Sequence, residues 1–401
     1  MINARLLFIE NMSTAKEEIR KIGVDAVSIP WLSNKSLFIT MKIENASTFA
    51  ANIIKQEMLG KGGDVAVNRG VANFSTQTSD ILIMGTYAQY NKLVYKLEMQ
   101  PGCLKEIGEE IKRVLTGLDI GKPEYFECGK YKLPIGEKTY IMGILNVTPD
   151  SFYEGNRLTT EIDLLEKVEQ MVSEGAMIID VGSVSTRPGA EMISTKDELS
   201  RLIPAVKAIK RHFPEIPLSI DTFRSWVAVS VMEEVGPVIV NDISGGSIDS
   251  KMFETIGKMQ VPYILTHIQG IPGNMQDNPW YRDVVHDVSA ELSESVRRLT
   301  KLGVGDILID PGFGFGKTMD HNYKLLNRLD SFKVFQLPLV VGLSRKSMVW
   351  QVLETSPEQA LNGTTVLNTM ALLGGADILR VHDVKPAAEV IRLFLQLKES
   401  L

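Results

Sequence analysis

The sequence predicts an α/β protein in which a smaller α/β domain precedes a (β/α)₈ barrel. The chain has 401 residues, which is more than one average domain holds. From Tyr140 onward, short apolar segments alternate with amphipathic ones in eight repeats over about 260 residues, close to the typical size of that barrel. The first 118 residues follow a less regular pattern. An open, doubly wound sheet is the alternative, but eight evenly spaced repeats favour a closed barrel.

The composition excludes several classes of protein. Apolar residues make up 44% and charged residues 23%, as in ordinary globular proteins. A net charge of −6 gives no general attraction for nucleic acid or anionic membranes. The two cysteines, Cys103 and Cys128, form no CxxC motif, so a disulfide framework and a structural zinc site are not expected. With neither a signal-like start nor 18 consecutive apolar residues, we expect a cytoplasmic protein without a membrane segment.

Residues 1–118 read as a small α/β domain of unknown role. The segments with strand-like composition are 6–9, 36–39 and 80–86, and those with helical spacing are 47–59 and 103–118. Between them, the glycine-rich stretch 60–70 carries Asp64, Asn68 and Arg69. It matches no motif with a fixed mechanism, so we expect a structural turn, with anion binding as the alternative.

Residues 119–139 change in character, because Gly, Pro and Lys are scattered and no period persists. We interpret them as a linker or a β-hairpin lead-in, which sets the boundary of a barrel domain at 140–401. The expected barrel strands are 141–145, 176–181, 217–221, 238–241, 262–267, 306–309, 338–342 and 377–381. Amphipathic helices are expected, for example, at 164–174, 199–212, 226–235 and 387–397.

Polar side chains stand at the carboxyl end of nearly every expected strand, where such barrels build their sites. They are Asn146, Asp180, Asp221, Asn241, Asp242, His267, Asp310, Ser344, Arg345, Lys346, Arg380 and His382. A lone Asp after a strand is more often a helix cap or a turn residue. Eight such endings that converge on one face predict a functional site.

The chemistry of these residues has two halves. Asp221, Asn241 and Asp310 suit a flat heterocycle rich in N–H groups, because a carboxylate that faces an amino-pyrimidine edge makes two charge-assisted hydrogen bonds. The residues that suit an anionic group such as phosphate are Asn146, Arg187, Arg380 and His382. The loops 146–155 and 183–189 are long enough to act as mobile covers. The residues alone therefore predict a site for a heterocycle that carries phosphate.

The segment DPGFGFGKT, residues 310–318, invites a different interpretation. Gly316-Lys317-Thr318 resembles the end of a P-loop, but Pro311 occupies the place of the required first glycine, so we reject that reading. Its three glycines permit a tight backbone turn beside a ligand. We assign Asp310 to the site and leave Lys317 outside it.

Seven motifs in register resemble the dihydropteroate synthase family over residues 140–395. They are MGILNVTPDSF (142–152), STRPGA (185–190), SIDTF (219–223), NDISGG (241–246), DPGFGFGK (310–317), SRKS (344–347) and RVHDV (380–384). The resemblance implies a TIM barrel, usually dimeric. It implies a transferase of folate biosynthesis that joins p-aminobenzoate to 6-hydroxymethyl-7,8-dihydropterin diphosphate with Mg²⁺ and releases pyrophosphate.

The resemblance also implies a role for each matching residue. The catalytic residues would be Asp221, Lys346, Arg380 and His382. The pterin would be held by Asp221, Asn241, Asp310 and Lys346, and the diphosphate by Asn146, Thr186, Arg187, Arg380 and His382, with Asn146 at the Mg²⁺. The p-aminobenzoate and sulfonamide pocket would be lined by Phe152, Thr186, Pro188, Phe315 and Ser344.

Three places in the chain, with four residues in all, depart from the family pattern. Val184 replaces a carboxylate of the second loop, Tyr153-Glu154 replaces the more usual Ser-Asp, and Thr266 stands where Met is common. Because the first two changes lie in the covering loops, they affect the expected details of amine binding. The N-terminal 118 residues lie outside the resemblance.

Two other functions remain open. Pterin-dependent methyltransferases share the barrel but need no diphosphate site, so STRPG, SRK and RVHD argue against them. A pterin- or phosphate-binding protein without activity would lack a Mg²⁺ or diphosphate residue, whereas Asn146, Arg380 and His382 are all present.

Overall fold

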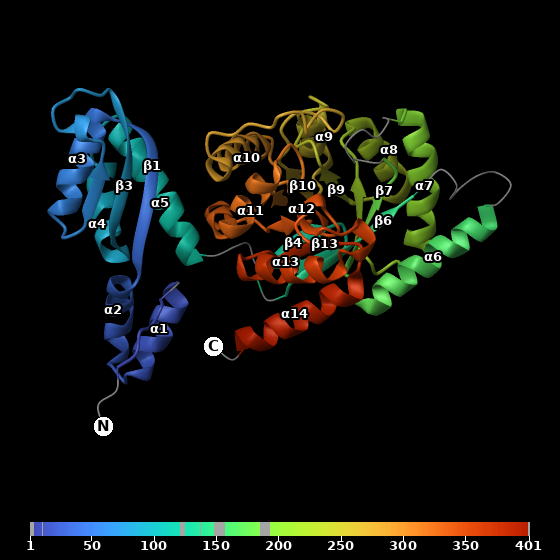
Figure 1. Ribbon diagram of the computed structural model, residues 1–401, viewed down its shortest axis with the longest axis horizontal. Helices are drawn as coiled ribbons and strands as arrows, with labels where there is room; N and C mark the ends of the chain where they lie inside the picture. The colour runs from blue at the N-terminus through green and yellow to red at the C-terminus, as the bar shows by residue number, and fades with distance from the viewer. Residues whose placement is uncertain are drawn as a thin grey trace. The chain divides into compact units, whose positions relative to one another are not determined.

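A computed structural model describes residues 4–9, 11–120, 125–136, 138–147, 157–184 and 193–399, without the side chains of 117–120 and 157–160. The chain divides into two compact units, Met1–Gly121 and Lys122–Leu401, each described here by itself. Figure 1 colours the chain from blue at the start of the first unit to red at the end of the second.

The first unit contains a three-stranded antiparallel sheet in the order β1-β3-β2, packed against helices around its own apolar core. Its elements are α1 (Met12–Lys21), α2 (Ile29–Ser36), β1 (Phe38–Ser47), α3 (Thr48–Leu59), β2 (Asp64–Val67), β3 (Thr78–Thr86), α4 (Tyr87–Glu98) and α5 (Cys103–Ile120). Helix α3 begins where the side chain of Ser47 accepts a hydrogen bond from the Ala50 N–H.

Most elements expected in the first unit are confirmed. The helices expected at 47–59 and 103–118 are α3 and α5, and the segments at 36–39 and 80–86 lie in β1 and β3. The strand expected at 6–9 is wrong. Those residues have no regular structure, and Leu6 and Phe8 are more than 80% exposed. A strand needs a partner for its backbone groups, and the described sheet pairs only β1, β2 and β3.

The glycine-rich stretch 60–70 is partly a turn and partly a strand. Gly62 has φ +81°, which suits glycine, but β2 follows at once and pairs with β3. The side chain of Asn68 accepts a hydrogen bond from the Gly70 N–H at 2.8 Å, so it is used within the chain. This part of the molecule therefore has a structural explanation that needs no anion.

The second unit is a closed barrel of eight parallel strands. These strands are β6 (Tyr140–Asn146), β7 (Ile178–Gly182), β8 (Leu218–Asp221), β9 (Ile239–Asp242), β10 (Tyr263–Thr266), β11 (Ile307–Asp310), β12 (Val340–Val341) and β13 (Ile378–Val381). Their order is β11-β10-β9-β8-β7-β6-β13-β12, and a parallel bridge between Ile309 and Leu339 joins the two ends. The closed barrel is confirmed, and the doubly wound alternative is excluded.

Helices surround these strands on the outside (Figure 1). They are α6 (Arg157–Glu174), α7 (Thr195–His212), α8 (Ser225–Val235), α9 (Met252–Met259), α10 (Val284–Lys301), α11 (Met319–Asn327), α12 (Ser347–Trp350), α13 (Leu361–Leu373) and α14 (Val384–Glu399). The four helices named from the sequence lie within α6, α7, α8 and α14. Helix α7 shows why such a segment is helical. The side chain of Ser194 caps its start, its first turn contains acidic residues, and its last turn contains basic residues.

A β-hairpin packs into the amino end of the barrel. Its strands β4 (Tyr125–Cys128) and β5 (Tyr131–Pro134) come from the segment expected to be a linker or a hairpin lead-in. Phe126, Cys128 and Ile135 are buried in one apolar cluster with strand residues such as Met142 and Leu308. We call this cluster the barrel floor. Burial raises the pKa of the Cys128 thiol to about 12, so it packs as a neutral group.

Candidate active site

Above the barrel floor, the interior changes from apolar to polar. On β7, Ile178 belongs to the floor, and Asp180 lies two residues further along the strand, on the same face. On β9, Ile239 is followed in the same way by Asn241, and on β11 Leu308 is followed by Asp310. The period of two thus places a polar layer towards the carboxyl ends of the strands.

The centre of this layer is the guanidinium of Arg380, from β13. Its Nε donates to Oδ2 of Asp180 at 2.7 Å, and its Nη2 donates to Oδ2 of Asp221 at 2.6 Å. Burial alone would lower the pKa of Arg380, but the two carboxylates outweigh burial and raise that pKa above its ordinary value. Arg380 therefore stays charged, and its two bonds use two of its five N–H groups.

The pKa of Asp221 lies close to neutral pH. Burial raises its pKa to about 7, against the opposing charge of Arg380, and the negative charges of Asp180, Asp242 and Glu198 raise it further. A carboxyl group poised in this way can exchange a proton or a hydrogen bond with a ligand near neutral pH.

Asp310 and Lys346 form the second charged pair of the layer. Oδ1 of Asp310 accepts a hydrogen bond from the Gly312 N–H at 2.7 Å, and burial raises the pKa of Asp310 while Lys346 opposes that shift. Burial lowers the pKa of Lys346 to about 8 although Asp310 favours its charged form. The Nζ of Lys346 donates to the Phe313 carbonyl and lies 4.7 Å from the ring centroid of Phe315.

The glycines of the loop after β11 are required by close backbone approaches. Gly312 has φ +73°, and a Cβ there would lie 1.8 Å from the His267 carbonyl oxygen. Gly316 has φ +62°, and a Cβ there would lie 2.3 Å from the Gln269 carbonyl oxygen. Lys317, which we left outside the site, is buried beneath this loop and donates to the carbonyls of Gly312 and Phe315 at 3.0 Å each.

Ser344 and His382 meet at the rim of the barrel. His382 is exposed, and its Nδ1 lies 3.0 Å from Oγ of Ser344, which is buried. Arg345, between Ser344 and Lys346 in sequence, turns away and forms a two-pronged ion pair with Asp383 at 2.9 and 2.7 Å. Ser344 and Lys346 thus lie at the candidate site, whereas Arg345 between them forms a structural ion pair.

Asn146 lies at the exposed end of β6, beside Gly182 on β7. A Cβ at Gly182 would lie 3.6 Å from Oδ1 of Asn146 and 3.7 Å from Oδ2 of Asp221. Glycine therefore leaves open the space between these two side chains. Four residues of the expected site, Phe152, Thr186, Arg187 and Pro188, and most of both covering loops lie outside the described residues.

An apolar cluster lies beside the polar layer. Its buried members are Val184, Phe223, Ile243, Ile268, Met275 and Phe315. Val184, the departure noted in the second loop, is thus packed with Phe315. Phe315 is only 8% exposed as a member of this cluster.

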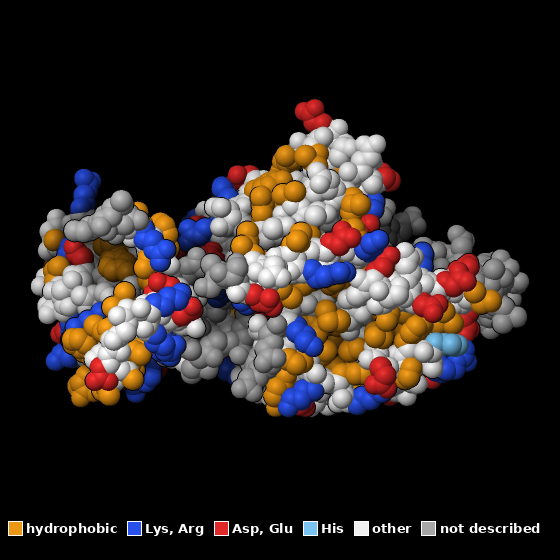
Figure 2. All heavy atoms as spheres, turned by 90° about the horizontal axis from the view of Figure 1, so that it is seen from below, with side chains coloured by type: hydrophobic (Ala, Val, Ile, Leu, Met, Phe, Trp, Pro, Cys, Tyr) orange, Lys and Arg blue, Asp and Glu red, His pale blue; other side chains and the backbone are white. Residues whose placement is uncertain are grey.

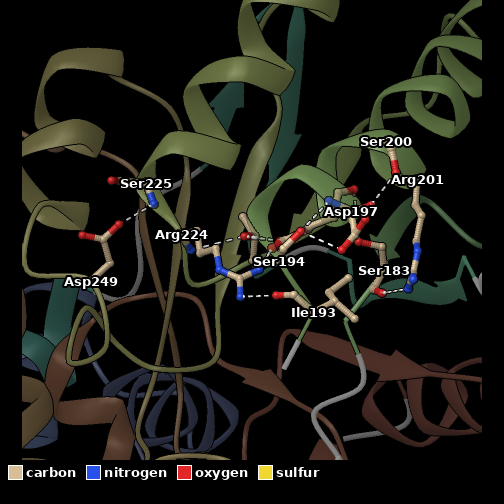
Figure 3. Close-up of polar contacts among 11 residues, drawn as sticks. Ser183, Ile193, Ser194, Asp197, Ser200, Arg201, Arg224, Ser225 and Asp249 are labelled. Carbon is tan, nitrogen blue, oxygen red and sulfur yellow. Dashed lines mark hydrogen bonds and ion pairs between the residues drawn. The ribbon is translucent and has the colours of Figure 1, made fainter. Parts of the chain in front are cut away.

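Sequence reasoning missed a polar network that follows Asp221 (Figure 3). Glu198 on α7 is completely buried; it accepts a hydrogen bond from the Thr222 hydroxyl at 2.6 Å and pairs with the guanidinium of Arg224. Arg224 also donates to the carbonyl of Ile193 at 2.7 Å. Thr222 and Arg224 belong to the segment directly after β8, whereas Glu198 lies in the first turn of α7, just before the residues where a helix was expected. The network joins α7 to the segment that carries Asp221.

Comparison with known proteins agrees with this geometry. Residues 142–382 match the family model of the pterin binding enzymes. A dihydropteroate synthase of Escherichia coli is 44% identical over 256 residues, which are 63% of this chain and 90% of the relative. A solved Yersinia pestis dihydropteroate synthase in complex with a sulfonamide drug is 38% identical, with a TM-score of 0.64 over 69% of this chain and all of that one.

A further relative extends beyond the barrel. A Helicobacter pylori protein named as a bifunctional dihydropteroate synthase and dihydropteroate reductase is 31% identical over 392 residues, 97% of this chain and 98% of that protein. The fold and the polar layer thus define a pterin-binding enzyme. This chain belongs to the dihydropteroate synthase family, whose members are transferases of folate synthesis. The predicted family and enzyme class are confirmed. Among the described residues, no helix is long and apolar enough to cross a membrane.

Proposed function

We propose that this chain condenses p-aminobenzoate with 6-hydroxymethyl-7,8-dihydropterin diphosphate, and that the polar layer binds the pterin ring. The observation that carries this assignment is the convergence of Asp221, Asn241, Asp310 and Lys346 around Arg380 above an apolar floor. Carboxylates and an amide oxygen suit the amino and ring N–H groups of a pterin, and Lys346 suits its ring acceptors. The cation of Lys346 and the ring of Phe315 would lie together beside the amine.

The reaction needs little activation of the nucleophile, because an aromatic amine is neutral and has a free electron pair at neutral pH. The bond between the pterin methylene and the diphosphate oxygen breaks, and its electron pair leaves with pyrophosphate. The amine nitrogen then bonds to the methylene carbon and loses a proton. The charge of Asp221 stabilises the positive charge that develops on the pterin. His382 at the rim and the N–H groups of Arg380 other than those bonded to Asp180 and Asp221 stabilise the charge of the departing group.

Mg²⁺ is proposed as the metal of this reaction, with Asn146 as its protein partner. Among the described residues, no group of three or more His, Cys, Asp or Glu side chains is placed to hold a metal. Mg²⁺ typically keeps several waters and binds through few protein oxygens together with substrate phosphates, which fits the single exposed amide oxygen of Asn146. When bound, the metal would neutralise charge on the diphosphate.

A homodimer is proposed from the surface of the second unit. Helices α13 and α14 pack side by side, and α13 exposes Val366, Met370 and Leu373 at a spacing that forms one stripe. Leu393 on α14 is 75% exposed. Figure 2 views the side of the molecule on which α14 lies in Figure 1 and shows hydrophobic side chains gathered between charged ones. Exposed apolar groups of this kind favour association with a second copy.

A cytoplasmic location stays a prediction.

The test is a direct assay of the purified chain. With the pterin diphosphate, p-aminobenzoate and Mg²⁺, we expect release of pyrophosphate and formation of dihydropteroate in equal amounts. Binding of the pterin without turnover would refute the synthase assignment and favour a binding protein. Methyl transfer from a methylated pterin would favour the methyltransferase alternative.

A second activity, reduction of dihydropteroate, is proposed from the full-length match to the bifunctional Helicobacter pylori protein. A match over 392 residues must include most of the first unit as well as the barrel. The reduction needs a hydride donor, so the assay would supply dihydropteroate with a reduced nicotinamide or a reduced flavin. Formation of tetrahydropteroate with oxidation of the donor is the expected result. Unchanged dihydropteroate with every donor, under conditions where the synthase is active, would refute this activity.

A further inference from the structure

Asp180 belongs to the polar layer at the strand ends, although the family resemblance gives it no role in binding or catalysis. It lies on β7 and is completely buried. Its Oδ2 accepts two hydrogen bonds, from Nε of Arg380 at 2.7 Å and from Nδ2 of Asn241 at 3.1 Å. One carboxylate oxygen thus ties together side chains from β7, β9 and β13.

The bond to Asn241 dictates which way its carboxamide faces. An ionised carboxylate only accepts hydrogen bonds, so Asn241 must turn its NH₂ group towards Asp180. Its carbonyl oxygen Oδ1 is then the atom available to a ligand. Within the described residues, Asp180 is the only hydrogen-bond partner of the Asn241 side chain. Without Asp180, the amide can rotate and offer either its oxygen or its nitrogen.

The bond from Arg380 to Asp180 likewise fixes the orientation of the guanidinium. With Nε held by Asp180, the plane of the guanidinium is oriented, and Nη2 reaches Oδ2 of Asp221 at 2.6 Å. Arg380 is also half of the chain away from Asp180 in sequence, so this contact is made only when the barrel closes. Asp180 therefore controls the partner of Asp221 as well as the orientation of Asn241.

One further observation singles out Asp180. Its second oxygen, Oδ1, is buried and has no hydrogen-bond partner within the described part of the chain. Buried polar atoms are nearly always satisfied, so an unsatisfied carboxylate oxygen calls for an explanation. Ser219, its neighbour in the register of β7 and β8, is also completely buried, and none of the described residues is a hydrogen-bond partner of its hydroxyl.

We infer that Asp180 is a positioning residue for pterin recognition: it fixes the carboxamide of Asn241 with its oxygen towards the ligand and holds Arg380 against Asp221. This inference rests on the proposed function. Asp180 need not touch the substrate. Its negative charge also adds to the raised pKa of Asp221.

The test compares Asp180→Asn with Ser219→Ala, a control at the equally buried neighbouring position. In Asp180→Asn, both bonds to Oδ2 lose the carboxylate charge that strengthens them, and a carboxamide nitrogen in the place of Oδ2 would break both. We expect KM for the pterin diphosphate to rise about 10- to 100-fold, as for loss of a hydrogen bond to a charged group. KM for p-aminobenzoate should change less than threefold. The acid limb of the pH profile should move to lower pH, because Asp221 loses a negative neighbour.

The control separates positioning from general damage to the barrel. Ser219→Ala should keep both KM values within threefold of the wild type. The inference is overturned if Asp180→Asn binds the pterin like the wild type, or if both variants raise the KM of both substrates alike. Activity of the wild type tests the proposed function, whereas the ratios between variants test the role of Asp180.

An exchange variant covers the case in which Asp180→Asn does not fold. Asp180→Asn combined with Asn241→Asp exchanges the amide and the carboxylate. Residue 180 then donates the hydrogen bond to residue 241, and residue 241 again presents an oxygen to the ligand. Isothermal titration with 6-hydroxymethylpterin should give an affinity within about tenfold of the wild type. An affinity more than 100-fold weaker, in a variant with wild-type thermal stability, would overturn the inference.

Discussion

The Nζ of Lys317 lies 2.9 Å from Nδ1 of His267, inside the second unit. Both side chains are buried, and two cations cannot share that space without a large cost. Burial, with the charge of Lys317, lowers the pKa of His267 to about 4, and burial lowers the pKa of Lys317 to about 7. His267 is therefore neutral and accepts at Nδ1, and Lys317 supports the loop after β11 through the carbonyls of Gly312 and Phe315.

Replacement of Lys317 by Met should change how stability depends on pH. Between the folded pKa of about 7 and the usual pKa of lysine, the unfolded state binds more protons, so the free energy of unfolding of the wild type rises with pH. The variant lacks that contribution. We expect the difference in free energy between wild type and variant to grow by a few kcal/mol from pH 6.5 to pH 9. Urea unfolding at both pH values measures it.

The exposed Lys324 provides the control for that experiment. It lies on α11, seven residues further along, and its ion pair with Asp320 is largely open to solvent. Lys324→Met should leave the pH dependence of unfolding as in the wild type. A constant difference between wild type and Lys317→Met at all pH values would show that Lys317 is not buried as a titrating group.

The rate with low pterin concentrations should follow a bell-shaped pH profile. Asp221 gains a proton as the pH falls through about 7, and Lys346 loses its proton as the pH rises through about 8. kcat/KM for the pterin diphosphate reports the free enzyme, so it should fall on both sides of that range. Lys346→Arg should remove the alkaline limb, because arginine stays charged there. Steady-state rates from pH 5.5 to 9.5 would show it.

Two variants at the same positions test the assigned roles more severely. Asp221→Asn and Lys346→Ala should each lower kcat/KM at least 100-fold, because each leaves buried polar partners unpaired at the ligand. The thermal unfolding of both variants serves as the control for folding. Either variant with a rate near the wild type would remove its residue from the pterin site.

A charge in the exposed stripe of α13 should prevent dimerisation. Met370→Glu places a carboxylate amid Val366 and Leu373, where burial against a second copy would be costly. We expect the variant to sediment as a monomer and the wild type as a dimer in analytical ultracentrifugation. Trp226→Glu, at another exposed apolar position of the second unit, is the matched control and should stay dimeric.

Loss of a floor side chain should reduce stability without altering recognition. Phe126 is 1% exposed within the barrel floor, and Phe126→Ala should cost about 3–5 kcal/mol of unfolding free energy. Tyr125, its half-exposed neighbour on β4, is the control, and Tyr125→Ala should cost far less. KM for both substrates should be unchanged in each folded variant. Equal effects of the two substitutions on stability would contradict the packing described.

The eight barrel strands could be predicted because each is a short apolar run at a regular spacing, and the period of two then assigns residues such as Asp310 to the interior. The segment 6–9 shows the limit of that signal: four apolar residues suggest a strand, but only a partner makes one. Helix α4 was missed although Tyr90, Leu93, Val94 and Leu97 already carry helical spacing and are all buried.

The partners within the site could not be predicted in the same way. Nothing local in the sequence indicates that Arg380 meets both Asp180 and Asp221, because these contacts span 200 and 159 residues and depend on closure of the barrel. The contacts of Glu198 were hidden for the same reason, because they reach Thr222 and Arg224 across 24 and 26 residues and join two barrel elements. Lys317 was left outside the site from its sequence, and only the fold shows how it supports the loop after β11.

The hairpin of β4 and β5, which packs into the barrel floor, limits where the barrel can be joined to another domain. Phe126, Cys128 and Ile135 precede the first barrel strand, so a gene fusion that joined new sequence directly to Tyr140 would leave the interior open to water. Recombination is tolerated only upstream of β4, near the division between Gly121 and Lys122. In a gene fusion, the barrel therefore has to keep about fifteen residues ahead of its first strand. A different domain can replace the part of the chain before them.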